Sequence, residues 1–173
     1  MTAADFSTYA IISLGSNLPS GKGDCLDTLA FAANSLAALS DLPVFTSSVY
    51  RTSPVDSPAG TPDFYNMAAA LLPLPDTSPL ALLHELQAIE TAADRKRSGI
   101  RNEARTLDID LITFGKETCD TPELILPHPR AHERRFVLEP VMEVVGKDFV
   151  LPGMAESLHT LCEEISDQDI LKL

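Results

Sequence analysis

The chain has 173 residues, of which 45% are hydrophobic and 22% are charged. These values are typical of a globular protein, so we expect one domain over residues 1–173. No apolar run reaches the ~20 residues of a membrane span, and the first nine residues lack the Lys or Arg of a secretory leader. The three widely spaced cysteines argue against a disulfide framework, so we expect a cytoplasmic protein.

The formal net charge of −12 makes nucleic acids and anionic membranes unfavourable partners. The charge is nevertheless uneven, because nine of the thirteen Lys and Arg residues lie between Arg95 and Arg135. An acidic protein that collects its arginines in one segment can bind an anion there. A solvated charged face remains the alternative at this point.

The first half of the chain alternates strand and helix patterns. A strand is predicted over residues 9–15, and a helix over 24–39. β-forming residues predict two further strands over 44–51 and 64–72, paired as a hairpin across a proline-rich loop. A second helix is predicted to begin at Ser78, with proline at its first helical position.

The second half begins with a polar and basic segment at 92–104, which predicts a mobile loop, and a strand over 106–114 follows it. A short strand at 124–126 and helices over 136–145 and 154–165 complete the prediction. The order strand, helix, strand, strand, helix, strand indicates an α+β protein with the ferredoxin-like split βαβ fold and a mostly antiparallel sheet. We expect helices on one face of the sheet and a site on the other.

The most informative motif is Asp108-Ile-Asp110. On a strand, alternate side chains share a face, so the two carboxylates point the same way while Leu107 and Ile109 point into the core. Neighbouring carboxylates repel each other and resist joint burial. Mg²⁺ removes that cost, and it is commonly held by one or two carboxylates together with substrate phosphates. A solvated polar face without metal is the alternative.

Four arginines flank this motif. Arg105 directly precedes the strand, and Arg95, Arg97 and Arg101 lie in the predicted loop. Guanidinium groups bind phosphate oxygens bidentately and can neutralise charge during phosphoryl transfer. The combination of two carboxylates and four arginines therefore predicts a site for a polyphosphate.

Two other motifs say less about function. His128 and His132 lack the arrangement of a zinc protease, because Pro129 argues against a helix across them. His128 fits a phosphate ligand or a structural turn. The spacing from Gly15 to Gly21 is one residue too long for a P-loop, and Gly23 follows Lys22 where Ser or Thr is required.

Six segments of residues 11–142 together resemble a known family. They are Leu14-Gly-Ser-Asn17, Ser48-Val-Tyr-Arg-Thr-Ser-Pro54, Pro62-Asp-Phe-Tyr-Asn66, Gln87-Ala-Ile-Glu90, Arg105-Thr-Leu-Asp-Ile-Asp110, and Pro127-His-Pro-Arg130 with Arg134-Arg-Phe-Val137. The sequence resembles the 6-hydroxymethyl-7,8-dihydropterin pyrophosphokinases of folate biosynthesis. This resemblance implies transfer of the pyrophosphoryl group of ATP to the hydroxymethyl group of a reduced pterin, with release of AMP. It also implies a ferredoxin-like fold with mobile catalytic loops, two Mg²⁺ ions and a monomer.

The resemblance assigns roles to residues of this chain. The metal-binding positions are Asp108 and Asp110, and the arginines that assist transfer are Arg95 and Arg105. The positions that contact ATP are Gln87, Arg97, Arg101, His128 and Arg134. The positions of the pterin pocket are Thr52, Ser53, Val55, Phe64, Asn66 and Phe136, and Glu90 supports the arginine loop.

The chemistry of a pterin agrees with these residue types. A flat heterocycle suits stacking between two aromatic faces, which Phe64 and Phe136 can supply. Asn66 has both a donor and an acceptor for the heterocycle edge. Core packing of the two phenylalanines is the alternative.

The chain also departs from the family. Many members have Trp-Gly-Pro before the arginine that opens the strand, whereas Asn102-Glu103-Ala104 stands here and the chain has no Trp. A stacking or lid contact is therefore absent, and Glu103 adds negative charge near the phosphates. A catalytically inactive ligand-binding domain thus remains a second hypothesis. A single-stranded RNA-binding module is a third, which the net charge disfavours.

Overall fold

The computed structural model describes residues 5–54, 57–96, 99 and 103–173. Its main sheet has the strand order β5-β1-β4-β3-β8, with β2 also paired to β4. The first three strands of this order are β5 (Asp108–Phe114), β1 (Ala10–Ser16) and β4 (Phe64–Leu71), followed by β3 (Tyr50–Thr52), β8 (Leu171–Lys172) and the short β2 (Phe45–Thr46). All of these pairings are antiparallel, which confirms the predicted ferredoxin-like arrangement.

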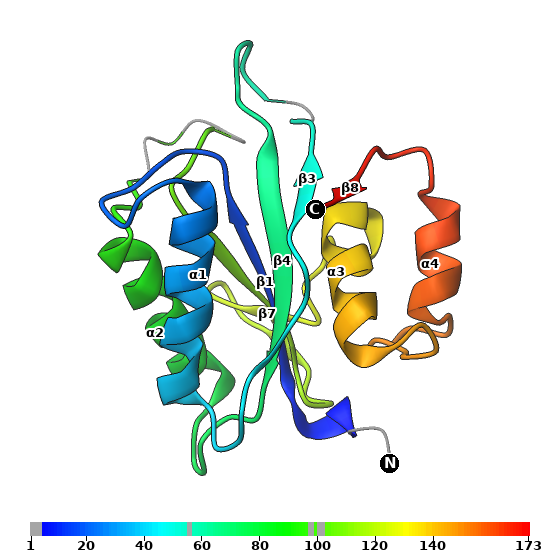
Figure 1. Cartoon of the computed structure of the whole chain (residues 1–173). Helices are drawn as coiled ribbons and strands as arrows, with labels where there is room; N and C mark the ends of the chain where they lie inside the picture. The colour runs from blue at the N-terminus through cyan, green and yellow to red at the C-terminus, as the bar shows by residue number, and fades with distance from the viewer. Residues whose placement is uncertain (1–4, 55–56, 97–98, 100–102) are drawn as a thin grey trace.

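One face of the sheet is covered by α1 (Cys25–Ser35) and α2 (Pro79–Ala92), as Figure 1 shows. Asp24 and Asp27 form a reciprocal capping box at the start of α1, and Ser78 caps α2 through the Ala81 amide. A short 3-10 helix, Leu36–Leu39, extends α1. The core on this face combines helix and strand side chains, including Leu29, Leu82, Leu86, Ile12, Leu14 and Leu107.

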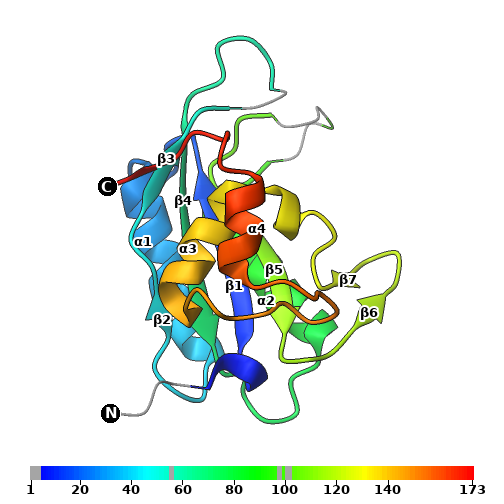
Figure 2. The same ribbon diagram turned by 90° about the vertical axis from the view of Figure 1, so that its right-hand side faces the viewer.

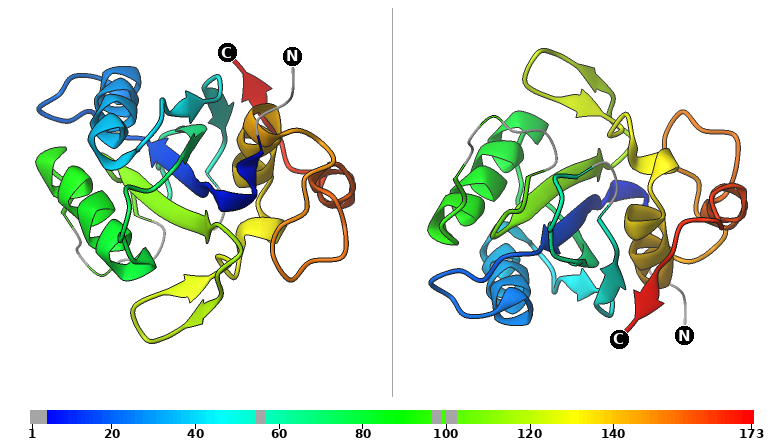
Figure 3. Two further views of the ribbon diagram at one scale, coloured as in Figure 1. Left: turned by 90° about the horizontal axis from the view of Figure 1, so that it is seen from below. Right: turned by 90° about the horizontal axis from the view of Figure 1, so that it is seen from above.

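The opposite face is not left free, and here the prediction of helices on one face only is wrong. Helix α3 (Arg135–Val145) lies on it, and α4 (Leu158–Glu164) packs on the outer side of α3, as the two views in Figure 3 show. The strand residues Ile11, Ala68 and Ile112 are buried against these helices. Because these strands carry apolar side chains on both faces, both faces must be covered. The site is therefore restricted to one end of this face.

Three smaller differences from the predicted elements are local. The predicted strand 44–51 is divided into β2 and β3, because the Ser47 hydroxyl accepts the Ala68 amide hydrogen bond at 2.9 Å. Helix α4 is shorter than predicted, since Ser157 caps it through Thr160. A hairpin of β6 (Cys119–Asp120) and β7 (Ile125–Leu126), visible in Figure 2, lies in part where only a turn was predicted.

Two further 3-10 helices, Phe6–Thr8 and Ala131–Glu133, precede β1 and α3. Among the residues that the structure describes, no helix is long and apolar enough to cross a membrane.

Candidate active site

The two carboxylates of the Asp108-Ile-Asp110 motif lie on one face of β5, as the alternation predicts. Both line the larger of two pockets, whereas Leu107 and Ile109 are buried in the core on the other side of the sheet. On the neighbouring strand β1, Gly15 pairs with Asp108 and Ser13 pairs with Asp110. Both β1 residues also line the pocket, so the floor of the site is made by two central strands.

Asp108 lies between two arginines. Its Oδ1 is 3.1 Å from Arg95 Nη1, and its Oδ2 is 3.3 Å from Arg105 Nη1. Three of the residues predicted to act in catalysis are therefore in direct contact. The two positive charges offset the negative charge of Asp108.

Glu90 fixes Arg95 from behind. Its Oε2 accepts the Ile109 amide hydrogen bond at 2.8 Å and lies 3.3 Å from Arg95 Nη1. Arg95 Nη1 also donates to the Leu107 carbonyl at 2.6 Å, and only 8% of the Arg95 side chain is exposed. The guanidinium of Arg95, near the start of the predicted loop, is thus anchored against β5. Its Nε is buried and has no hydrogen-bond partner among the described residues.

Asn17 places Arg105. Its Oδ1 accepts the Arg105 amide hydrogen bond at 2.7 Å, and its Nδ2 donates to the Pro62 carbonyl at 3.2 Å. The Asn17 amide donates in turn to the Arg105 carbonyl. One buried side chain therefore joins the loops that follow β1, precede β4 and precede β5.

The charge of Asp110 is only partly compensated. Burial and the neighbouring Asp108 raise the pKa of Asp110 to about 7, against the lowering influence of Arg134. A carboxylate in this position is stabilised by an additional positive charge. The metal-free arrangement is therefore suited to gaining a cation.

The larger pocket, of about 540 Å³, joins these groups to the predicted pterin positions. Thr52, Ser53, Phe64, Asn66 and Phe136 all line it, as do Arg105 and Arg134. Asn66 Nδ2 donates to Thr52 Oγ1 at 3.0 Å, so the amide is oriented by a buried neighbour. The structure thus brings together most of the predicted site.

Two cation–π contacts orient the aromatic rings of the pocket. The Arg105 guanidinium carbon lies 5.9 Å from the centre of the Phe64 ring, and that of Arg134 lies 5.6 Å from the centre of the Phe136 ring. Each ring is therefore held by an arginine that also faces the pocket.

Other predicted residues lie beside or outside the pocket. Gln87 is exposed on α2, and neither it nor His128 is among the described residues that line the pocket. The His128 amide donates to the Ile112 carbonyl of β5, and burial followed by the charge of Arg134 lowers the pKa of His128. Val55, Arg97 and Arg101 lie outside the described residues.

Sequence reasoning missed several residues that line the pocket. Ser13 and Gly15 could have been found by alternation, because they lie on the face of β1 opposite Ile12 and Leu14, which are in the core. Arg130, Glu133 and Arg135 lie within the arginine-rich segment but had no individual signal. Asp167, Gln168 and Asp169 lie outside every motif of the sequence named above.

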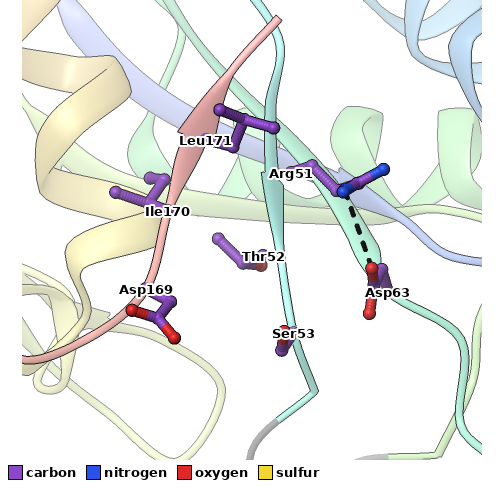
Figure 4. Close-up of a pocket in the computed structure, with 7 residues that line it drawn as sticks. All are labelled: Arg51, Thr52, Ser53, Asp63, Asp169, Ile170 and Leu171. Atoms are coloured by element: carbon purple, nitrogen blue, oxygen red, sulfur yellow. Dashed lines mark ion pairs between the residues drawn. The ribbon is translucent and has the colours of Figure 1, made fainter.

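A smaller pocket of about 300 Å³ adjoins the larger one and shares Thr52, Ser53 and Asp169 with it. Figure 4 shows that it lies between β3 and the segment that ends in β8, with the ion pair of Arg51 and Asp63 at one side. It lacks the carboxylates of β5, so we place the candidate site in the larger pocket.

The donor set fits a divalent cation that is shared with a substrate. In the described part of the chain, no group of three or more His, Cys, Asp or Glu side chains is arranged to hold a metal ion. The protein offers the two aspartates of β5, and the remaining ligands of Mg²⁺ would be phosphate oxygens and water. The fold and these groups define a candidate site for phosphoryl chemistry.

Comparison with known proteins identifies the family. Residues 11–146 match the family 7,8-dihydro-6-hydroxymethylpterin-pyrophosphokinase (HPPK). A 2-amino-4-hydroxy-6-hydroxymethyldihydropteridine pyrophosphokinase of Haemophilus influenzae is 36% identical over 165 residues, covering 95% of this chain and 97% of the relative. The Pseudomonas aeruginosa protein of the same name is 37% identical over 144 residues, covering 82% of each chain. The chain belongs to the HPPK family.

A solved structure supports the fold. A Plasmodium falciparum HPPK-DHPS triple mutant superposes with a TM-score of 0.67 over 90% of this chain at 13% identity. This chain spans 44% of that protein.

Proposed function

We propose that this chain transfers the pyrophosphoryl group of ATP to the hydroxymethyl group of 6-hydroxymethyl-7,8-dihydropterin, with release of AMP. Its family and its relatives make it an ATP-dependent diphosphotransferase of folate biosynthesis. The observation that carries the assignment of the site is the placement of Asp108 and Asp110 in one pocket with Asn66 and the two phenylalanines.

In the proposed reaction, the hydroxymethyl oxygen attacks the β-phosphorus of ATP. The bond from this phosphorus to the oxygen of the α-phosphate breaks, AMP leaves with that oxygen, and the hydroxyl proton is released. Such reactions require mainly positioning and neutralisation of charge. A strong side-chain base is not needed for this mechanism.

Asp108 and Asp110 are the residues that would hold magnesium, and the raised pKa of Asp110 supports this role. When bound, two Mg²⁺ ions would neutralise phosphate charge and lower the pKa of the attacking hydroxyl. Arg95 and Arg105 are proposed to release Asp108 and to bind phosphate oxygens instead. Their present contacts with Asp108 are consistent with this exchange.

We assign the remaining residues by their positions. Phe64 and Phe136 would stack on the pterin, while Thr52, Ser53, Val55 and Asn66 would bind its polar edge. The residues that would contact ATP are Gln87, Arg97, Arg101, His128 and Arg134.

We further propose that the protein is a cytoplasmic monomer that acts on small molecules. It would have no nucleic-acid or membrane partner, in keeping with the net charge of −12.

The test supplies ATP, Mg²⁺ and the reduced pterin, and separates the nucleotide products. We expect AMP and pterin diphosphate in equal amounts. Formation of ADP would exclude pyrophosphoryl transfer. Binding of both substrates without any AMP would favour the second candidate, an inactive ligand-binding domain, which Asn102-Glu103-Ala104 supports.

A further inference from the structure

A segment that the family's motifs do not include completes the wall of the larger pocket. Residues 166–173 follow α4 and return across the molecule to pair with β3, as Figures 2 and 4 show. The family match ends at residue 146, so this segment lies beyond it. Asp167, Gln168 and Asp169 nevertheless line the pocket that holds Arg105, Asp108 and Asp110.

The segment is attached to the start of α3 by two side chains. Gln168 Oε1 accepts the Arg135 amide hydrogen bond at 2.9 Å, and Gln168 Nε2 donates to the Glu133 carbonyl at 2.9 Å. In return, Arg135 Nη1 donates to the carbonyls of Gln168 at 2.7 Å and Ser166 at 3.1 Å. These four hydrogen bonds form a reciprocal connection between α3 and segment 166–173.

The connection supplies what α3 lacks. The first amides of a helix have no partner within it, and the residue that precedes α3, Arg134, forms no side-chain cap. Gln168 satisfies the Arg135 amide from a distant part of the chain. Because Phe136 is the next residue, the same contact restrains the backbone that carries this ring into the pocket.

A second attachment fixes the other end of the segment. Lys172 pairs with Tyr50 in the sheet, and the Leu173 amide donates to the Val49 carbonyl at 2.9 Å. Lys172 Nζ also lies 3.3 Å from Glu143 Oε1, a carboxylate that accepts the Tyr50 hydroxyl hydrogen bond at 2.7 Å. Segment 166–173 is thus held at both ends, and its central residues border the pocket.

The position of the segment indicates which substrate it affects. Asp169 lines both pockets together with Thr52 and Ser53, which belong to the proposed pterin positions. Of the residues proposed to contact ATP, Arg134 lines the larger pocket but Gln87 and His128 do not, and the described lining of the smaller pocket includes none of them. The segment therefore borders the pterin end of the site.

We propose that segment 166–173 forms the outer wall of the pterin pocket, and that Arg135 and Gln168 are positioning residues that hold this wall in place. The proposal rests on the assignment of the larger pocket to the pterin. A wall ordered before binding reduces the entropy lost when the substrate binds. Disrupting it should weaken pterin binding and leave the phosphate chemistry on β5 largely intact.

The experiment compares Gln168→Ala with Glu163→Ala, a truncation of an exposed side chain on α4. We expect Gln168→Ala to raise KM for the pterin about tenfold, which corresponds to the net loss of one or two hydrogen bonds. The turnover number and KM for ATP should stay within about twofold of wild type. Glu163→Ala should leave all three values unchanged.

Gln168→Glu provides a conservative comparison. It retains an acceptor for the Arg135 amide but cannot donate to the Glu133 carbonyl. We expect a pterin KM between those of wild type and Gln168→Ala. If Gln168→Ala does not fold, Gln168→Glu provides the test. Its KM for the pterin should be raised, while its KM for ATP and its turnover number should not change.

The proposal is overturned if the thermal midpoint falls while the pterin KM is unchanged, or if KM for both substrates rises equally. Binding of the oxidised analogue 6-hydroxymethylpterin, followed without ATP, separates this proposal from the proposed function. Wild type that binds the analogue but forms no AMP would contradict only the reaction. Equal analogue affinity in wild type and Gln168→Ala would contradict only the wall.

Discussion

Asn66 on β4 lies directly across the sheet from Gly15 on β1, and the glycine leaves room for the asparagine side chain. A Cβ atom on residue 15 would lie 2.9 Å from Asn66 Oδ1, which is closer than real Cβ atoms approach. Asn66 is 3% exposed and donates to Thr52. Gly15 therefore leaves the space in which Asn66, a proposed pterin-binding residue, adopts its present orientation.

The first prediction concerns this pair. Gly15→Ala should displace the Asn66 amide from Thr52 and raise the pterin KM about tenfold, the effect of losing one good hydrogen bond. Steady-state kinetics with the pterin varied provide the measurement. In an Asn66→Ala background the added methyl group meets no amide, so the same substitution should have little further effect. An equal effect in both backgrounds would refute the steric explanation.

The second prediction concerns Asn17, which joins three loops through buried hydrogen bonds. Asn17→Ala should leave the Arg105 amide and the Pro62 carbonyl without this partner and lower the free energy of unfolding by about 1–3 kcal/mol. Turnover should also fall, because Arg105 loses its restraint. Urea unfolding and AMP formation measure the two effects. Asn34→Ala, the same substitution at an exposed position of α1, is the matched control.

The third prediction concerns Arg95 and Glu90. Arg95→Ala removes a proposed phosphate ligand and should lower turnover by about 10²–10³-fold. Because Glu90 is buried at 3% exposure and would lose this partner, stability should also decrease, by about 3 kcal/mol. Glu90→Gln in the same background removes the buried charge and should restore stability without restoring turnover. Recovery of both would show that Arg95 acts only through folding.

The fourth prediction uses the raised pKa of Asp110. The folded metal-free protein holds the Asp110 proton up to about pH 7, whereas an unfolded aspartate loses it near pH 3.9. The folded state therefore binds more protons between these values, and this contribution to stability increases as the pH falls from 7 towards 4. Urea unfolding in EDTA should show the trend in wild type. Asp110→Asn should lack this component.

The same variant tests the metal. At pH 8, Mg²⁺ with a non-hydrolysable ATP analogue should raise the melting temperature of wild type and should have less effect on Asp110→Asn. Turnover of the variant should fall by about 10²-fold or more, because a charged metal ligand is lost. Wild-type turnover in Asp110→Asn would remove the proposed metal role.

Local patterns were sufficient where a single strand or helix determines the answer. The alternation in β5 predicted that Asp108 and Asp110 share a face, and Ser78 with Pro79 marked the start of α2. The sequence analysis did not predict that helices also cover the second face of the sheet. Ile11 and Ile112 nevertheless lie on that face, opposite the core beneath α1 and α2. A two-residue pattern on a strand does not specify which helix packs on it.

Contacts between distant segments had no local signal. Gln168 caps α3 through an amide more than thirty positions earlier, and nothing in the surrounding residues marks it as a helix cap. The division between β2 and β3 depends on the Ser47 hydroxyl meeting the Ala68 amide, which requires the register of β4. Features of this kind depend on which segments pack together in the folded chain, so they cannot be predicted from the neighbouring residues in sequence.

The central position of β1 has a consequence for folding. Its strand partners are β4 and β5, which both follow it in the chain. The pairing of Gly15 is therefore complete only when Asn66 and Asp108 have both joined the sheet. Distant pairing of this kind slows folding, since the entropy of the intervening chain is lost before the contacts form. During synthesis, β1 therefore keeps one unpaired edge until β5 has been made, and an unpaired apolar strand edge favours aggregation.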